Sequence, residues 1–366
     1  MSDRIDVDFS LAIHNRTGKY FIGRDLLETP GLPLGDVYYW RAVGAAPPVG
    51  LAGKIIGRLQ HWQIRGQALG GPMRIMPRRR SRRPLLHLDP FTVPTTHLQH
   101  SDAVLCHDIG PVTHPALFDA DVGRIYAHIY RTCERVSPHM IFVSEATRAA
   151  FCAAYPAADA RRMRVIYPAI RAGIAAVQPE PVPGIDGPFL LTVGSIGDRK
   201  NQARCITAFA RSGLAERGVR YVLCGAREPG AERVEQAALA TRGVLCLPYV
   251  SDAGLSWLYG NASGFVLASL LEGFGMPVAE AIARDLVPLV SAASVLHEVA
   301  GDGALLADPE NVASIAREMQ LMIDMHDDER DARLVRLRQS IGRFGLGAIQ
   351  DSWRHAFADI LAERGE

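Results

Sequence analysis

One stretch about three quarters of the way along the chain, residues 262–281, constrains the fold more than any other. It begins with a short apolar run, residues 262–268, of the kind that forms a buried parallel strand, and it ends in a helical pattern. The turn Gly273–Gly275 joins the two. Pro277 suits the first helical turn, because its ring fixes φ and it lacks the N–H that would be unpaired there. The sequence therefore predicts a strand, a glycine turn and a helix that begins near Met276.

Two glutamates lie close to that helix start. Glu272 is in the turn, and Glu280 lies about one turn inside the helix. The free N–H groups of a helix start carry roughly half a positive charge and form an anion site. A carboxylate beside a bound pyrophosphate would be repelled, so both glutamates are better suited to accept hydrogen bonds from neutral sugar or ribose hydroxyls. This pattern predicts a sugar-nucleotide site; the alternative is a helix cap at Glu272 and a solvated surface residue at Glu280.

Length and charge limit the class of protein. With 366 residues the chain is long enough for two domains, since a single core stops growing near about 250–300 residues. The net charge of +1 gives no global field that would attract nucleic acid. No apolar run approaches the ~20 residues that span a bilayer, and the first residues lack the features of a secretory signal. We expect a cytoplasmic protein that binds no nucleic acid.

Neither the cysteines nor an acidic pair near the N-terminus predicts a metal site. The six cysteines are widely spaced, without a Cys-x-x-Cys pair, whereas metal and disulfide frameworks need closer clustering. We interpret them as reduced, mostly buried thiols. Asp6-Val7-Asp8 matches an Asp-x-Asp metal pattern, yet it lies inside the first strand rather than at the end of a later one. We therefore expect no bound metal.

The turn after the first strand is expected to border the active site. The strand covers residues 5–13 and the turn covers residues 15–20. In an open α/β sheet the ligand crevice lies beyond the carboxyl ends of the strands. Gly18 and Lys19 are therefore candidates for contacts on the acceptor side.

Residues 30–84 are the least readable part of the chain. A strand at 37–40 and a helix at 49–67 precede an arginine-rich segment, Arg78–Arg83. So many arginines are not expected to be buried, which leaves two interpretations. They form a solvated loop, or they form a patch that contacts an anionic membrane or a lipid-diphosphate acceptor, at about 1 kcal/mol for each basic residue. A nucleic-acid arm is less favoured because no aromatic stacking pattern accompanies the arginines.

A histidine and an aspartate follow another predicted strand, residues 101–106. His107 and Asp108 stand at its carboxyl end, and a glycine and a proline come directly after them. This position places both side chains in the crevice of an open α/β sheet. The alternative is a turn with a surface histidine.

The second half of the chain begins after a proline-rich stretch, residues 179–188, whose composition is typical of an interdomain linker. The buried strand at 189–193 is followed by a turn that contains Gly194, Arg199 and Lys200. Paired cations in a strand–helix turn, opposite another helix start, are what a departing diphosphate requires. Arg199 and Lys200 are therefore predicted to bind phosphate, with solvated surface charge as the alternative.

These motifs agree with one known family. Glu272-Gly-Phe-Gly-Met-Pro-x-x-Glu280-Ala, followed by Pro288-Leu-Val-Ser291 and by residues 298–309, closely resembles the donor-site signature of retaining glycosyltransferase family 4, the glycosyl transferases group 1. The turn that contains Arg199 and Lys200 matches the corresponding family motif. The His107 segment is similar to an element of mannosyltransferase-like members.

The resemblance covers nearly the whole chain except residues 30–84, and it implies an α/β fold of the GT-B type. This fold has two Rossmann-like, doubly wound domains that face each other across a cleft. The implied parts are an N-terminal acceptor-side domain at residues 1–178, a linker at 179–188, a nucleotide-sugar-binding domain at 189–345, and a C-terminal helix at 346–366 that crosses back to the first domain.

The resemblance also assigns roles to residues. His107, Asp108 and Glu272 would be the catalytic group, with His107 touching the transferred sugar. The remaining donor contacts would come from the second domain. Arg199 and Lys200, in the turn that also contains Gly194, would bind the diphosphate, and Glu280 would bind the ribose. The backbone of Gly273, Phe274 and Gly275 would hold the hexose, and Tyr249 and Val250 would border the nucleobase. No carboxylate is placed as a nucleophile, and no metal or further cofactor is implied.

The sequence thus predicts a retaining hexosyltransferase that moves mannose from GDP-mannose to a glycan or a lipid-linked oligosaccharide. The choice of mannose rests on the His107 segment alone. A UDP-sugar or deoxyhexose donor on the same fold remains an alternative, as do a sugar-nucleotide hydrolase or epimerase and a non-catalytic membrane scaffold. If the arginine segment contacts lipid, the enzyme works at the inner face of the plasma membrane.

Overall fold

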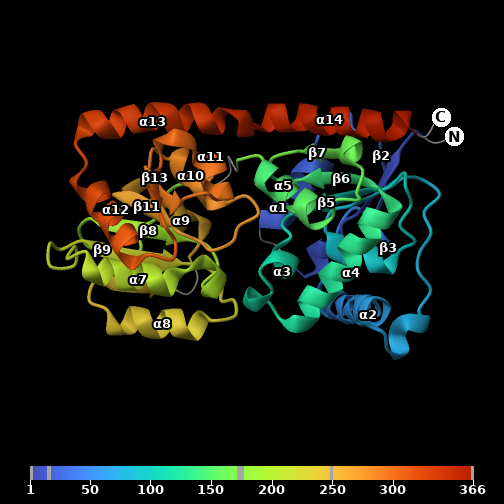
Figure 1. The fold of residues 1–366 in the computed structure, drawn as a ribbon, viewed down its shortest axis with the longest axis horizontal. Coiled ribbons are helices and arrows are strands. Elements are labelled where there is room, and N and C mark those ends of the chain that lie inside the picture. Colours follow the sequence, from blue (N-terminus) through green and yellow to red (C-terminus); the bar gives the residue numbers. More distant parts are fainter. Residues whose placement is uncertain (1–2, 15–17, 171–176, 248–249, 364–366) are drawn as a thin grey trace. The chain divides into compact units, whose positions relative to one another are not determined.

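The computed structural model describes residues 3–14, 18–170, 177–247 and 250–363, and its chain divides into two compact units. Unit 1 comprises residues 1–169 together with 346–366, and unit 2 comprises residues 170–345. Each unit is built on one largely parallel sheet with helices (Figure 1), so the predicted α/β fold is confirmed. The proline-rich residues 179–188 form no helix or strand and belong to unit 2.

The sheet of unit 1 has the strand order β3-β2-β1-β4-β5-β6-β7, parallel except for the β2–β3 pair. Its strands are β1 (Ile5–Asp8), β2 (Leu34–Tyr39), β3 (Ala42–Val43), β4 (Leu85–His87), β5 (Ala103–Cys106), β6 (His139–Phe142) and β7 (Met163–Val165). Its α-helices are α1 (Gly18–Leu27), α2 (Gly50–Leu69), α3 (Gly110–Thr113), α4 (Ala120–Val136), α5 (Glu145–Ala154) and α14 (Leu346–Ala362). Short 3-10 helices η1 (Ser10–Ile13), η2 (Pro72–Ile75), η3 (Pro90–Thr95), η4 (Pro115–Leu117) and η5 (Ala160–Arg162) connect them.

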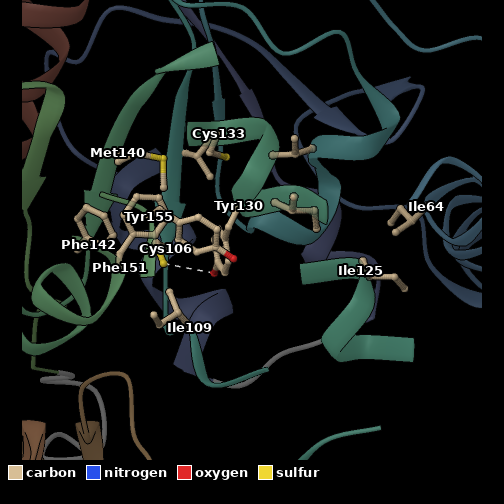
Figure 2. Packing of buried hydrophobic residues seen from close by; sticks show 13 residues of the cluster. Ile64, Cys106, Ile109, Ile125, Tyr130, Cys133, Met140, Phe142, Phe151 and Tyr155 are labelled. Atoms are coloured by element: carbon tan, nitrogen blue, oxygen red, sulfur yellow. Dashed lines mark hydrogen bonds between the residues drawn. The ribbon is translucent and has the colours of Figure 1, made fainter. Parts of the chain in front are cut away.

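The core of unit 1 fills the space between the sheet and α4 and α5 with large aromatic side chains. Tyr130 of α4 meets Phe151 of α5 edge to face, with ring centroids 5.6 Å apart. Tyr155 packs on both rings, and the Tyr130 hydroxyl lies 3.3 Å from the thiol of Cys106 (Figure 2). Full burial of each such side chain contributes about 1.5–3 kcal/mol. This core fixes the end of β5, directly before His107.

Unit 2 has the parallel strand order β10-β9-β8-β11-β12-β13. Its strands are β8 (Phe189–Val193), β9 (Arg220–Cys224), β10 (Val244–Leu247), β11 (Gly264–Leu267), β12 (Pro288–Ser291) and β13 (Leu305–Ala307). Its helices are η6 (Asp198–Lys200), α7 (Gln202–Arg211), α8 (Ala231–Ala240), α9 (Asp252–Asn261), α10 (Met276–Ile282), α11 (Val295–Ala300), η7 (Gly301–Gly303), α12 (Val312–Asp324), α13 (Asp327–Ile341) and η8 (Gly342–Phe344). The strand, glycine turn and helix predicted at residues 262–281 are confirmed as β11 and α10.

The first strand is shorter than the prediction of residues 5–13. It ends at Asp8, and η1 follows at once. The Asp8 carboxylate accepts hydrogen bonds from the N–H and the hydroxyl of Ser10, at 3.1 and 2.6 Å. Such a local side-chain bond competes with the sheet ladder and turns the backbone. Leu11 and Ala12 of η1 are nevertheless buried, which explains why the pattern resembled a longer strand.

Within the segment Arg78–Arg83, Arg79 is much less exposed than the solvated-loop interpretation predicts. Its side chain is only 16% exposed, lies 3.4 Å from the Asp8 carboxylate, and stacks 3.5 Å from the ring centroid of Tyr38. Arg83 similarly donates to the Asp6 carboxylate at 3.1 Å. The physical reason is that the carboxylates of Asp6 and Asp8 are buried and need compensating charge. Contact between this segment and lipid stays a prediction, and only the other arginines of the segment are available for it.

Within the described residues, no helix combines the length and the apolar character that crossing a bilayer requires. The cytoplasmic location stays a prediction.

Candidate active site

The closest contact between predicted site residues joins Lys200 to Glu272. Lys200 ends η6, in the loop after β8, and Glu272 lies in the loop after the neighbouring strand β11. The Lys200 ammonium is 2.5 Å from Glu272 Oε1, and the two side chains are 8% and 7% exposed. Ser269 donates a second hydrogen bond to the same oxygen at 2.8 Å. The structure therefore brings two predicted donor-site residues together as one buried ion pair.

Arg199 extends this pair. One guanidinium nitrogen lies 3.5 Å from Glu272 Oε2 and donates to the carbonyl of Leu271 at 3.3 Å. The other nitrogen lies 3.3 Å from the carboxylate of Glu228. Sequence reasoning missed Glu228, which follows β9 in the chain. The available signal was that β9 and β8 are neighbours in a parallel sheet, so that their carboxyl ends share one edge.

The electrostatics keep Glu272 ionised. Burial acts to raise the pKa of its carboxyl, but attraction to Lys200 and Arg199 and hydrogen bonds from Lys200 and Ser269 outweigh burial. The net effect holds the pKa of Glu272 below its usual value. Both carboxylate oxygens are engaged by cations in this state, so the lone pairs of Glu272 are poorly available for covalent attack.

Two glycines keep the backbone close to this cluster. Gly194 has φ 146°, and a Cβ built there would lie 3.7 Å from Cε of Lys200. Gly275 has φ 95° at the N-cap of α10, where a Cβ would approach Cδ2 of Leu296 to 2.3 Å. A side chain is strained at such φ values. The Gly273–Gly275 turn can therefore present its backbone to a ligand.

The Phe274 side chain packs inside unit 2, and the predicted contact of its backbone with the hexose stays a prediction. Its side chain is buried, and its ring meets Phe344 edge to face with the centroids 5.0 Å apart. The ring anchors the turn, and the backbone is what residue 274 can offer to a bound sugar.

Glu280 is a buried residue of α10 rather than the solvated surface residue of the alternative interpretation. It is 5% exposed, and Tyr259 of α9 donates a hydrogen bond to its Oε2 at 3.0 Å. α10 has seven residues. Val250 directly precedes Ser251, whose hydroxyl caps α9 by accepting from the N–H of Gly254. Tyr249 lies outside the described residues.

His107 of unit 1 is buried directly after β5. Its Nε2 lies 2.8 Å from the carbonyl oxygen of Leu88. Because a carbonyl only accepts, Nε2 carries the hydrogen and Nδ1 is the acceptor. Burial, assisted by the charge of Lys19, lowers the pKa of His107 to about 4. The imidazole is therefore neutral at pH 7 and offers one lone pair to a hydroxyl.

Lys19 and Asp108 occupy well-defined positions in unit 1. The Lys19 ammonium pairs with the carboxylate of Asp89 at 3.2 Å, and this attraction raises the pKa of Lys19 although burial opposes it. Sequence reasoning missed Asp89, which lies close behind β4 and caps η3. Asp108 accepts from the N–H of Gly110 at 2.9 Å, which is a turn-stabilising bond. A Cβ at Gly18 would meet open space.

The Asp6-Val7-Asp8 pattern has a structural use. Asp6 accepts hydrogen bonds from the Ser81 hydroxyl at 3.1 Å and from Arg83, whereas Asp8 is bound by Ser10 and Arg79. Among the residues described above, no three His, Cys, Asp or Glu side chains come together as a metal site would require.

Comparison with known proteins identifies relatives of this chain. Residues 180–336 match the family model described as glycosyl transferases group 1. Over 145 residues, 38% of this chain and 37% of the relative, the sequence is 32% identical to the O-antigen chain mannosyltransferase B of Escherichia coli. Over 230 residues, 60% of this chain and 61% of the relative, it is 27% identical to the O-antigen chain mannosyltransferase RfbU of Salmonella typhimurium. The matches span less than two thirds of either relative.

Among solved structures, a trehalose-6-phosphate synthase, OtsA, superposes on 98% of this chain and 99% of its own, with a TM-score of 0.67 and 14% identity. This likeness concerns the fold. The family match encloses Arg199, Lys200, Glu272 and Glu280. Residues 180–336 therefore belong to the glycosyl transferases group 1 family, and the chain has the GT-B fold.

Proposed function

We propose that this protein is a retaining mannosyltransferase that moves mannose from GDP-mannose to a glycan or a lipid-linked oligosaccharide. The observation that carries the proposal is the Lys200–Glu272 ion pair, extended by Arg199, within the family domain. The choice of mannose is supported by the names of the relatives, O-antigen chain mannosyltransferases, and by the His107 segment.

Lys200 and Arg199 would neutralise the departing diphosphate. Without a ligand, their two positive charges are balanced by Glu272 and Glu228. A diphosphate oxygen can replace Glu272 Oε1 as the partner of Lys200, so that the ammonium stays paired throughout. This exchange frees Oε1 to accept a hydrogen bond from a hydroxyl of the sugar. The negative charge that develops on the leaving phosphate would then be stabilised by Lys200 and Arg199, which are already in place, and this lowers the activation barrier.

Glu280 would bind the ribose. Its carboxylate already accepts from Tyr259 at 3.0 Å, and an ionised carboxylate has capacity for further donors such as two vicinal hydroxyls. Charge-assisted hydrogen bonds of this kind contribute about 1.5–3 kcal/mol each. Tyr259 holds the carboxylate in one orientation.

Retention of configuration would proceed without a covalent intermediate. With the donor bound, Oε1 of Glu272 would be occupied by a sugar hydroxyl and Oε2 by Arg199, and Asp108 is engaged in a turn. In this proposal the acceptor hydroxyl attacks the same face that the diphosphate leaves, while the ion pair of sugar cation and diphosphate persists. Nδ1 of His107 would accept a hydrogen bond from a hydroxyl of the transferred sugar. The reaction would need no metal ion or further cofactor.

Release of GDP from GDP-mannose, measured with and without a lipid-linked saccharide extract, tests this function. We expect release that depends on the extract and a glycosidic product of unchanged anomeric configuration. Equal release without any acceptor would identify a hydrolase instead. Turnover of UDP-glucose or of a GDP-deoxyhexose alone would refute mannose as the donor sugar, and no turnover of any sugar nucleotide would favour the scaffold.

A further inference from the structure

A cavity of about 650 Å³ lies within unit 1, bordered by η1, α2, η3 and α4. Its size falls within the ~300–1,000 Å³ range of small-molecule sites. Asp89 and Tyr126 belong to its lining, so the cavity adjoins the group formed by Lys19, Asp89 and His107. Helix α2 supplies half of the lining, and it belongs to the region that the sequence left unexplained.

The face of α2 at this cavity is built in rows that follow the helical spacing of three and four residues. The innermost row contains Gly57, Gln60 and Ile64, which are buried. The next row carries Lys54 and Arg58, exposed cations that both line the cavity. No carboxylate in the described part of the chain forms an ion pair with either cation. A basic rim without a counter-charge is suited to an anionic ligand.

A third row lies beside the basic one and is apolar. Leu51, Ile55 and Trp62 are 74%, 50% and 56% exposed. The helical spacing places these three exposed side chains on one side of α2, and apolar side chains gathered on a surface mark a binding site. Because this apolar row lies beside Lys54 and Arg58, the surface is suited to a ligand in which an anionic group is attached to a hydrocarbon chain.

The interior of the cavity is suited to a sugar. Gln60 is 2% exposed, and within residues 3–14, 18–170, 177–247 and 250–363 its amide has no hydrogen-bond partner. The donors and the acceptor of this amide are therefore available to a ligand in the cavity. The Asp89 carboxylate offers further acceptor capacity. The rings of His61, Phe91 and Tyr126 follow one another at centroid distances of 6.0 and 5.9 Å, which gives an aromatic wall against which a sugar ring can pack.

Gly57 shows that this arrangement is closely fitted. A Cβ at Gly57 would lie 2.2 Å from Cε1 of His14. The imidazole of His14 therefore lies directly against the α2 backbone and closes one side of the cavity.

We propose that this cavity is the acceptor site and that it takes a saccharide with a phosphate or diphosphate at one end. The sugar lies between Gln60, Asp89 and the aromatic wall, and its anionic group meets Lys54 and Arg58. The apolar row then receives the start of a lipid chain. This inference rests on the proposed function, because it names the acceptor of that same transfer.

The test uses calorimetric titration of the whole protein with inorganic pyrophosphate, mannose 1-phosphate and farnesyl diphosphate. We expect the double variant Lys54→Ala/Arg58→Ala to bind all three at least tenfold more weakly than the wild type. Arg131→Ala removes an exposed cation of α4 that does not line the cavity, so it is the matched control and should bind as the wild type does. All the altered side chains are exposed, so the fold should be retained.

The apolar row separates the two sources of such a ligand. If the acceptor is lipid-linked, farnesyl diphosphate binds at least tenfold more tightly than pyrophosphate, and Leu51→Ser/Ile55→Ser abolishes that gain. Equal affinities that still depend on Lys54 and Arg58 would support the site and identify a free sugar phosphate as the source. Binding that is unchanged in the double variant, or no binding of any probe, would overturn the proposal.

A GDP-mannose titration keeps this inference separate from the proposed function. The Lys54→Ala/Arg58→Ala variant should bind GDP-mannose like the wild type, because unit 2 is unaltered. Normal GDP-mannose binding without any probe binding refutes the acceptor site alone. Probe binding without GDP-mannose binding refutes the donor assignment and leaves the cavity as an anion site.

Discussion

The ammonium of Lys200 lies 2.5 Å from the carboxylate of Glu272, and this contact ties together the loops that follow two neighbouring strands, β8 and β11. Both side chains are almost fully buried. A buried ion pair adds little net stability, yet the loss of either partner leaves an uncompensated charge. In the proposed reaction, the diphosphate would replace Glu272 as the partner of Lys200, and the Glu272 carboxylate would accept a hydrogen bond from a sugar hydroxyl.

Lys200→Ala should weaken donor binding and also destabilise the fold. The diphosphate loses its main cation, and we expect kcat/KM to fall about 100- to 1000-fold, the range for removal of one preorganised charge-stabilising group. The Glu272 carboxylate is left with Arg199 and Ser269, so the free energy of unfolding should fall by about 3 kcal/mol. Urea unfolding and GDP-mannose turnover measure the two effects.

The double variant Lys200→Met/Glu272→Gln separates those effects. It removes both charges at similar volume, so stability should recover toward that of the wild type, whereas turnover should remain lost. Recovery of turnover would show that neither charge takes part in the reaction.

Glu280→Gln should weaken nucleotide binding more than it weakens the fold. A neutral amide retains the Tyr259 contact but forms weaker hydrogen bonds to ribose hydroxyls, and the loss of about 1.5–3 kcal/mol corresponds to roughly 10- to 100-fold in Kd. Titration with GDP checks this. Tyr259→Phe is the control, since it leaves the carboxylate in place and should cost less affinity. If Glu280→Gln bound GDP as tightly as the wild type, the ribose assignment would be wrong.

The sequence was sufficient to predict those structural features that depend on interactions between residues close together in the chain. The turn Gly273–Gly275 and the start of α10 at Met276 follow from a strand pattern, two glycines and a proline. The partners of the cations were not predictable in the same way. Glu228 reaches Arg199 from a different loop, and Asp89 reaches Lys19 from 70 positions away. Such pairs depend on how the strands are ordered in the sheet.

Residues 30–84 show the same limit. Their helix could be anticipated from apolar spacing, but the pairing of Arg79 with Asp8 required the register of β1 against its neighbours. Charge composition alone suggested a solvated or lipid-facing segment. The cavity beside α2 depends on Gly57 and on elements far away in the chain, and no local pattern marks it.

The buried histidine His107 predicts a pH dependence of stability. Its pKa is lowered to about 4 in the folded protein, against about 6.5 in the unfolded chain. The unfolded state therefore binds more protons between these values, so the contribution is present above pH 6.5 and is lost as the pH falls toward 4. From pH 7 to pH 5 we expect His107 to remove about 2 kcal/mol of unfolding free energy.

Urea unfolding of the wild type and of His107→Gln at pH 7 and pH 5 measures the contribution of His107 to this pH dependence. Between pH 7 and pH 5 the free energy of unfolding of the variant should fall by about 2 kcal/mol less than that of the wild type. His87 and His139 are also buried with lowered pKa values, so the stability of both proteins still depends on pH. Identical slopes would show that His107 is not buried in its neutral form.

Arg79 and Arg80 are adjacent in the chain but differ in exposure, so alanine substitutions at the two positions can be compared for their effect on stability. Arg79→Ala leaves the Asp8 carboxylate, whose side chain is fully buried, without its cation, and should cost about 3–5 kcal/mol. Arg80 is exposed, and Arg80→Ala should stay within about 0.5 kcal/mol of the wild type. Equal effects of the two substitutions would contradict the internal role of Arg79.

The most direct test of the central claim, that unit 2 binds a GDP-sugar through Lys200 and Glu280, is a thermal-unfolding panel. Wild type, Lys200→Ala and Glu280→Gln are heated with GDP, GDP-mannose, UDP, UDP-glucose, ADP or dTDP. A ligand at a hundredfold excess over its Kd stabilises the folded state by about 2.7 kcal/mol. We predict that only GDP and GDP-mannose raise Tm, and that both variants reduce the rise. A rise with uridine nucleotides alone would contradict the donor, and no rise with any nucleotide would contradict the site itself.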